Sequence, residues 1–253
     1  MAINWEKAQE NETKFWKSIY IQKHKDVASY MPITDDAALA FSKKSVERFG
    51  HGIDTICDRI VIDVGCGPYG LIKGFQVYAQ RIGNRPKKIY GVDSLMDTYL
   101  KFGTLPIEPY IEYIISKAES IPIADNSCCR VYSTNVIDHV EHPDKVLEEC
   151  RRIVKTTGEV FFAVHTINFP FSLLGPILFV VDKIHPHHFS KRYVMRLARR
   201  HFRNVTLTRK ITIFEDHPEF TLANTFLSPD KLRGLKRWLS TFLISTCYLK
   251  CSN

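Results

Sequence analysis

The stretch that decides the fold is Val61-Ile-Asp-Val-Gly-Cys-Gly-Pro-Tyr-Gly70. An apolar strand pattern over 59–64 runs into it and a helical pattern over 71–82 follows it, so its glycines fall on a strand-to-helix turn. Gly65 and Gly67 permit a tight turn and let a ligand approach the backbone. The spacing alone is weak evidence, because a tight turn that binds nothing would need the same residues.

Outward from this turn, strand and helix patterns alternate. We expect strands at 59–64, 88–92, 110–116, 129–135 and 159–164, and helices at 71–82, 94–102 and 143–154. This alternation predicts a doubly wound α/β fold, with a mostly parallel sheet covered by helices on both faces. Ser94 and Asp97 have capping-box spacing at the start of the helix at 94–102. Ser190 is expected to cap a helix that ends near His201, and 204–214 and 244–251 are expected to pair antiparallel at the sheet edge.

Two segments are expected in addition to this core, one at the N-terminus and one inserted after the fifth strand. Helical patterns at 4–28 and 36–49 predict an N-terminal helical cap over 1–58, followed by the ligand-binding domain over 59–253. The apolar insertion at 167–189 is too interrupted by proline and glycine to span a membrane. It is interpreted either as a cap helix packed on the domain or as a lid lining a pocket for an apolar or lipid-linked acceptor.

Composition and charge indicate the compartment and the kinds of partner to expect. The N-terminus has no apolar signal segment, and the seven cysteines include no CxxC pair, so we expect a cytoplasmic chain with reduced thiols, as a monomer or a homodimer. The formal net charge of +8 favours anionic partners. The helix after Ser190 carries a basic stripe, which is either a solvated face or a contact for substrate phosphates, a peripheral membrane surface or RNA. No nucleic-acid module is recognisable, so specific nucleic-acid binding is not expected. The stripe consists of Arg192, Arg196, Arg199, Arg200 and Arg203.

Two acidic residues beside the glycine turn indicate the charge of the ligand. Asp63 stands two residues before Gly65, where a pyrophosphate would meet a like charge and a cationic ligand would be favoured. Asp93 ends the second expected strand, where a carboxylate can accept both hydroxyls of a ribose, although it could also serve as a helix N-cap. Together they favour S-adenosylmethionine, which carries a sulfonium and an ammonium and no phosphate, over NAD.

Two further segments make the pattern specific. Lys117-Ala-Glu-Ser-Ile-Pro-Ile-Ala-Asp-Asn-Ser127 and Thr134-Asn-Val-Ile-Asp-His-Val-Glu-His-Pro143 follow in the right order. With the glycine turn, they resemble the seven-strand, class I S-adenosylmethionine-dependent methyltransferase family. The branch most similar contains ubiquinone/menaquinone-type and sugar-type small-molecule methyltransferases. The resemblance covers roughly residues 59–165 and implies a Rossmann-like sheet of seven strands whose last strand is antiparallel.

The resemblance also implies a set of cofactor-binding positions. The glycine turn would hold the methionine end, the acid after the second strand the ribose, the residues after the third strand the adenine, and those after the fourth the wall beneath the methyl group. Lys117 departs from the family pattern, which usually has an acid there for the adenine amino group. The implied residues are Asp63, Gly65, Cys66, Gly67, Asp93, Ser94, Leu95, Ala118, Glu119, Asn135 and Val136.

Histidines are the candidates for a catalytic base. His139 and His165 follow the fourth and fifth expected strands, at the sheet edge where parallel-sheet proteins place their chemistry. His188 belongs to a cluster with His185 and His187. Each could equally be structural, and no metal site is expected, because no acids stand at ligand spacing.

The sequence thus predicts an S-adenosylmethionine-dependent methyltransferase that acts on a small-molecule acceptor and releases S-adenosylhomocysteine. Oxygen is the expected acceptor atom, with carbon and nitrogen as open alternatives. A hydroxyl acceptor would need one of the histidines as base. The alternatives are a catalytically silent partner protein that binds the cofactor and an NAD-type oxidoreductase on a similar sheet.

Overall fold

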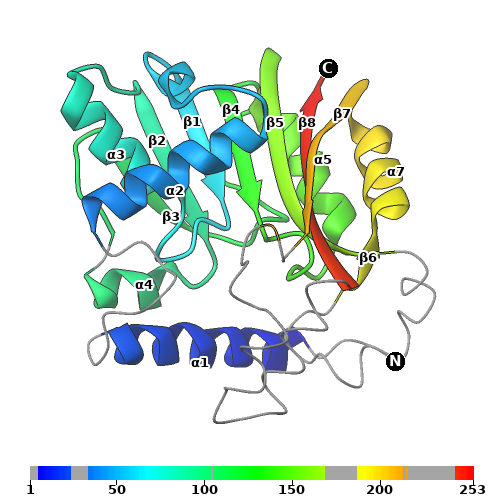
Figure 1. Ribbon diagram of the computed structural model, residues 1–253, viewed down its shortest axis with the longest axis horizontal. Helices are drawn as coiled ribbons and strands as arrows, with labels where there is room; N and C mark the ends of the chain where they lie inside the picture. The colour runs from blue at the N-terminus through cyan, green and yellow to red at the C-terminus, as the bar shows by residue number, and fades with distance from the viewer. Residues whose placement is uncertain (1–4, 24–33, 104, 169–186, 213–214, 216–242) are drawn as a thin grey trace.

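The computed structural model describes residues 5–23, 34–103, 105–168, 187–212, 215 and 243–253. In this part of the chain, an eight-stranded sheet forms the centre of the molecule, with the strand order β3-β2-β1-β4-β5-β8-β7 and with β6 paired to β5 (Figure 1). The strands are β1 (Ile60–Val64), β2 (Lys88–Asp93), β3 (Ile111–Ile115), β4 (Cys128–Thr134), β5 (Val154–Ile167), β6 (Phe189–Ser190), β7 (Asn204–Thr212) and β8 (Ile244–Ser252). The helices are α1 (Trp5–Lys23), α2 (Asp35–Arg48), the 3-10 turn η1 (Ile53–Ile56), α3 (Leu71–Ile82), α4 (Met96–Phe102), α5 (Pro143–Ile153) and α7 (Lys191–His201).

The pairing of the strands confirms the expected Rossmann-like topology. β1 through β6 pair in parallel, whereas β8 lies antiparallel between β5 and β7. The expected antiparallel pair at the sheet edge is therefore β7 and β8, with Val205 opposite Cys251. The seven expected strands are all present, and the two-residue β6 is an addition that the sequence did not indicate.

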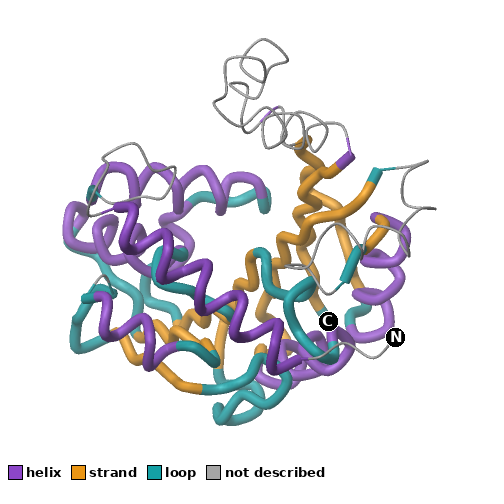
Figure 2. The backbone as a smooth tube through the Cα atoms, turned by 90° about the horizontal axis from the view of Figure 1, so that it is seen from below, coloured by secondary structure: helices purple, strands orange, loops and turns teal. Residues whose placement is uncertain are grey.

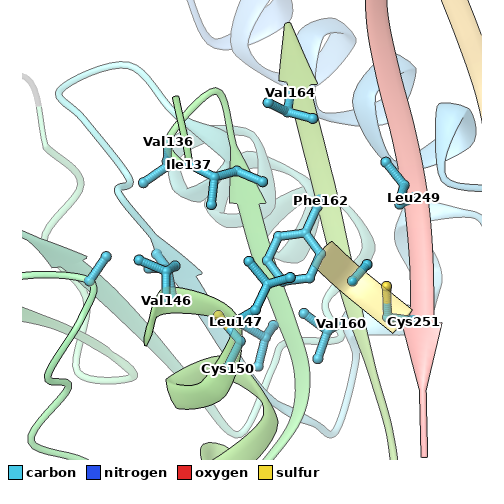
Figure 3. Close-up of a cluster of buried hydrophobic side chains, with 14 of the residues drawn as sticks. Val136, Ile137, Val146, Leu147, Cys150, Val160, Phe162, Val164, Leu249 and Cys251 are labelled. Carbon is cyan, nitrogen blue, oxygen red and sulfur yellow. The ribbon is translucent and has the colours of Figure 1, made fainter. Parts of the chain in front are cut away.

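Helices cover both faces of the sheet, as expected (Figure 1). One face is buried beneath α2 and α3, with Phe49, Phe75 and Phe161 in its core. The other is buried beneath α5 and α7, and there Phe162 of β5 lies between side chains of α5 and β8 (Figure 3). Side chains on a strand alternate between faces, so the neighbours Phe161 and Phe162 anchor opposite layers.

Three helix ends are determined by the residues at their boundaries. α3 has the bounds expected from its pattern and ends at Gly83, whose φ of 73° is the left-handed conformation that favours glycine. The hydroxyl of Ser190 accepts a hydrogen bond from the backbone N–H of Tyr193 (3.2 Å), which confirms it as the N-cap of α7. Thr34 caps α2 in the same way through Ala37 N (3.2 Å).

Other expectations were wrong or lie outside the described residues. Ser94 and Asp97 form no capping box, because α4 begins at Met96 and has no side-chain cap. β5 begins at Val154, five residues earlier than expected. The expected lid lies largely in 169–186, outside the described residues, as does the end of the helix expected at 4–28.

α1 is set apart from both helical layers. The arrowheads of β1 and β4 point toward it in Figure 1, so it lies at the carboxyl edge of the parallel strands. Seen from that side, it crosses in front of the strand ends (Figure 2). Within the described residues, no helix is long and apolar enough to cross a membrane.

Candidate active site

The glycine turn after β1 has the geometry that its sequence predicts. Gly65 and Gly67 have φ values of 67° and 55°, and the backbone N–H of Gly65 donates to the carbonyl oxygen of Val92 at the end of β2 (2.7 Å). A Cβ on Gly65 would overlap the side chain of Val136, which follows β4. The turn thus brings together two of the predicted cofactor positions, and only glycine allows this close approach.

Asp63 is a fully buried carboxyl group at the end of β1. Its Oδ2 accepts a hydrogen bond from the backbone N–H of Leu71 (3.3 Å), whereas its Oδ1 has no hydrogen-bond partner among the described residues. Burial, together with the nearby charge of Asp93, raises the pKa of Asp63 to about 7 against the opposing effect of the hydrogen bond. Ionisation near neutral pH therefore leaves a negative charge that lacks a compensating cation in this part of the chain.

Asp93 joins the glycine turn to the segment that follows β2. Its Oδ2 accepts from the backbone N–H of Gly67 (3.0 Å) and its Oδ1 from that of Leu95 (2.9 Å). Burial raises the pKa of Asp93 as well. Each carboxylate oxygen keeps a second lone pair, so the group can still accept ribose hydroxyls.

This pair of acids fits S-adenosylmethionine. Two carboxyl groups of raised pKa lie close enough to influence each other, and no ion pair joins either to a cation in the described residues. A cationic ligand would offset their charge, whereas a diphosphate would add like charge in a site of low dielectric constant.

A cavity of about 800 Å³ lies beside these acids, between α1 and the ends of β2 and β3. Ser94, the predicted adenosine-lining residue, lies on its wall, and its hydroxyl donates to Oε1 of Gln9 on α1 (3.2 Å). Its place directly after Asp93, the predicted ribose-binding acid, is where the adenosine end of the cofactor is expected. The lining residues are Gln9, Glu10, Thr13, Lys14, Lys17, Ser94, Ile115, Ser116 and Lys117.

Trp16 is the main site residue that sequence reasoning missed. A Cβ on Gly67 would lie 3.8 Å from its ring, and the ring centroids of Tyr69 and Tyr99 are each 6.2 Å away. Its indole N–H donates to Oε1 of Glu12 (3.5 Å). Trp16 is partly buried, and the helical pattern at 4–28 did not indicate that its ring lies against the glycine turn.

The remaining predicted cofactor residues divide into two groups. Cys66 and Ala118 are buried, and Asn135 is exposed with a φ of 58° directly after β4. Glu119 is engaged elsewhere, since its Oε1 accepts hydrogen bonds from the backbone N–H groups of Glu141 (2.9 Å) and His142 (3.2 Å). Its role beside the adenine stays a prediction.

Lys117, the departure from the family pattern, lines the cavity, and its ammonium lies 3.8 Å from a carboxylate oxygen of Glu141. Both side chains are about half exposed, so this pair contributes little to stability. The lysine thus places positive charge where the family usually has an acid.

The candidate histidines lie in two places. The backbone N–H of His139 donates to Val136 O (2.8 Å), and its Nε2 is 4.0 Å from a carboxylate oxygen of the buried Asp138. His187 packs on this segment through a 2.8 Å contact from its Nε2 to Val140 O, and burial lowers its pKa. His188, the next residue, is partly buried.

His165 is held against β8, with its Nδ1 3.1 Å from the hydroxyl of Thr246. His185 lies outside the described residues. Which of the three predicted histidines meets an acceptor, if any does, stays a prediction.

The fold and the acid-flanked glycine turn define a Rossmann-like, nucleoside-binding α/β domain, and comparison with known proteins makes this more specific. Residues 62–162 match the family described as "Methyltransferase domain". This match covers about two fifths of the chain and agrees with the S-adenosylmethionine-dependent methyltransferase that the sequence motifs predict.

Among curated proteins, the chain is similar to a tRNA U34 carboxymethyltransferase from Campylobacter concisus (strain 13826), at 31% identity over 108 residues. The aligned part is 42% of this chain and 35% of the relative, so the chain spans only about a third of that protein.

Two solved structures share the fold at low sequence identity. The first is a phosphoethanolamine N-methyltransferase 2 from Haemonchus contortus in complex with S-adenosylhomocysteine, with a TM-score of 0.60, 16% identity, and coverage of 85% of this chain and 52% of that one. The second is a geranyl diphosphate C-methyltransferase from Streptomyces coelicolor A3(2), with a TM-score of 0.59, 12% identity, and coverage of 84% and 78%.

Proposed function

We propose that this protein transfers the methyl group of S-adenosylmethionine to a small-molecule acceptor, at an oxygen atom. The observation that carries the proposal is the glycine turn flanked by Asp63 and Asp93, within the part of the chain that matches the methyltransferase family. An acceptor that is apolar or linked to a phosphate is consistent with the geranyl diphosphate bound by one structural relative. A cytoplasmic setting and a division of the chain near residue 58 remain parts of this proposal.

The residues of the chain would do three things in the reaction. The cofactor, when bound, supplies an activated methyl group on a sulfonium. Asp63 opposes its positive charge, Asp93 accepts the ribose hydroxyls, and Trp16 covers the glycine turn and excludes water. Holding cofactor and acceptor in line is then the main task, and such positioning can lower a barrier by about 7–11 kcal/mol.

A hydroxyl acceptor must also lose a proton, and His139 is our candidate for the base. The carboxylate of the buried Asp138 lies 4.0 Å from its Nε2, where its negative charge would stabilise the imidazolium that forms when the ring takes the proton of the acceptor.

Calorimetry and an activity assay test this proposal. S-adenosylmethionine and S-adenosylhomocysteine should bind, and NAD should not; tighter binding of NAD would overturn the proposal. His139→Asn should lower methyl transfer to a hydroxyl acceptor by about 10²–10⁴-fold at unchanged cofactor affinity. His142→Asn, a change at an exposed neighbour, should leave activity intact. Cofactor binding without release of S-adenosylhomocysteine over a broad acceptor panel would instead favour the silent partner protein.

RNA is a second candidate acceptor, favoured by the sequence similarity to a tRNA-modifying enzyme. Including bulk tRNA in the acceptor panel separates the two candidates. Methyl incorporation into tRNA, with none into small hydroxyl compounds, would replace the first proposal by the second.

A further inference from the structure

The positive charge of this protein is concentrated in one segment. Residues 187–212 contain eight lysine and arginine residues and no aspartate or glutamate. The formal net charge of the whole chain is also +8, so all other residues together sum to zero. A partner attracted by the charge of this protein would therefore be drawn to α7 and β7.

Four of these cations form a stripe along α7 and the turn that follows it. Arg192, Arg196 and Arg199 are exposed on one side of α7 and Arg203 is exposed just beyond its end, while the other side of the helix is buried in the core. None of the four has an ion-pair partner in the part of the chain that the structure describes. Arg200 differs, since it points toward α5 and pairs with Asp144 (3.4 Å). We call the four residues of the stripe the basic stripe.

The basic stripe is costly to maintain without a partner. Like charges three or four residues apart destabilise a helix, and here they recur from Arg192 to Arg199, over about 10 Å of its length. Lys191 at the start of α7 and Lys210 on β7 are exposed as well and extend the charge. Guanidinium groups in such a row suit an array of phosphates, which each can bind through two hydrogen bonds.

The stripe begins beside the candidate active site. Ser190, the N-cap of α7, lies opposite Ile167 at the end of β5, and the backbone N–H of His187 donates to Asp138 O (3.3 Å). From this carboxyl edge of the sheet, α7 runs away along the side of the molecule (Figure 1). A surface bound to the stripe would therefore pass close to His139.

We propose that the basic stripe docks this protein on a membrane surface that displays anionic phospholipid headgroups, with the active-site edge near the lipid. The orientation rests on the proposed function, because it would present a lipid-linked acceptor to the site. Clusters of lysine and arginine on an amphipathic helix are a feature by which peripheral proteins recognise anionic lipid headgroups.

A lipid surface fits the stripe better than RNA does. Proteins that bind single-stranded RNA combine cations with aromatic rings on which bases stack. Tyr193 is the exposed aromatic residue of α7, and its ring already stacks on Phe189, with centroids 5.2 Å apart. The described surface of α7 therefore offers phosphate-binding groups without a free stacking platform.

Co-sedimentation with vesicles tests the proposal. The full chain should bind vesicles of equal parts phosphatidylcholine and phosphatidylglycerol far more tightly than vesicles of phosphatidylcholine alone, and added salt should weaken the binding. The combined substitution Arg196→Glu, Arg199→Glu and Arg203→Glu should reduce affinity by about 100-fold or more, since each cation near an anionic surface contributes about fivefold. Unchanged binding of S-adenosylmethionine shows that the variant is folded, and glutamine at the same positions gives a milder second variant.

A matched control separates the effect of the basic stripe from the effect of the net charge of the protein. Lys43→Glu, Lys87→Glu and Lys101→Glu change the net charge equally at exposed positions on other parts of the molecule. The control should retain most of the vesicle binding. Equal loss in both variants, equal binding to neutral vesicles, or preferred binding of bulk tRNA that depends on the stripe would each overturn the proposal. The vesicle assay needs neither cofactor nor acceptor, so its failure is distinct from a failure of methyl transfer.

Discussion

At the scale of single residues, the charge of Asp63 is the feature expected to favour a cationic cofactor. The carboxyl group is buried, and one of its oxygens has no hydrogen-bond partner among the described residues. Burial raises its pKa to about 7 in the folded protein. Because the folded pKa lies above the unfolded value, stability of the free protein should decline as pH rises through 7. A cationic ligand bound beside Asp63 would offset this loss of stability.

We predict that S-adenosylmethionine binds more tightly as pH rises toward and through 7, with up to about a tenfold gain per pH unit below the pKa. The reason is that a cationic ligand favours the ionised Asp63, so binding releases a proton. Calorimetry in buffers of different ionisation enthalpy measures that proton directly. Asp63→Asn should bind more weakly and with little pH dependence, and an unchanged pH profile in this variant would assign the effect to another group.

Among the elements, α1 contributes a part of the site that lies outside the sequence motifs. Trp16 contacts the glycine turn and the rings of Tyr69 and Tyr99, although about fifty residues separate it from Gly67. We predict that Trp16→Ala weakens cofactor binding by about 10-fold or more, because loss of a packed aromatic ring removes about 1.5 kcal/mol or more and opens the turn to water. Cofactor titration measures the change. Phe15→Ala, at the neighbouring position, is the control, and equal effects of both would indicate a general loss of α1.

The contact between α2 and α3 depends on a single glycine. A Cβ on Gly74 would overlap both Ser42 Oγ and the backbone carbonyl oxygen of Ala38. We predict that Gly74→Ala costs about 2–3 kcal/mol of unfolding free energy, because backbone atoms cannot move aside as a side chain can. Denaturant unfolding measures this cost. Gly83→Ala, which has open space around it and only a positive φ, should cost about 1 kcal/mol; a smaller loss at Gly74 than at Gly83 would contradict the packing argument.

Most of the sheet and its helices could be predicted because each unit carries its own local signal. The helix at 71–82 is bounded by glycines that break its apolar period, and its bounds were predicted correctly. β6 has only two residues, too few for any period, and it exists because Phe189 meets Thr166 in the fold. Local pattern therefore predicts elements that have a period and not those created by pairing alone.

The candidate site shows the same division. The glycine turn and its two acids could be predicted, because neighbouring residues define them. The capping box at Ser94 was wrong, because Asp93 takes the N–H of Leu95 and Ser94 bonds to Gln9, 85 residues away. No local pattern contains that contact, or the position of Trp16 above the turn.

At the scale of the whole molecule, a network of polar side chains connects the segment after α2 with strands β4, β5 and β8. It lies at the end of the sheet opposite the candidate site. Arg130 of β4 pairs with Glu159 of β5 (3.1 Å), which also contacts Lys250 of β8. Tyr132 of β4 lies 3.3 Å from Nε2 of His51, which follows α2. Hydrogen bonding to Lys250 and the charge of Arg130 hold the pKa of Glu159 below its usual value, although burial opposes them.

His51 makes this network sensitive to acid. Burial first, and then the charges of Arg130 and Lys250, lower its pKa from 6.5 to about 4, against the contact with Gly52 O. Between pH 6.5 and about pH 4, His51 is therefore protonated in the unfolded chain but not in the folded chain. We predict that the free energy of unfolding falls as the pH is lowered across this interval. Because the ring is partly exposed, the expected loss is on the order of 1–2 kcal/mol. Thermal unfolding from pH 7 to pH 4 measures it against His51→Gln, which cannot titrate; parallel curves for the two proteins would mean that carboxyl groups elsewhere, and not this histidine, govern the response to acid.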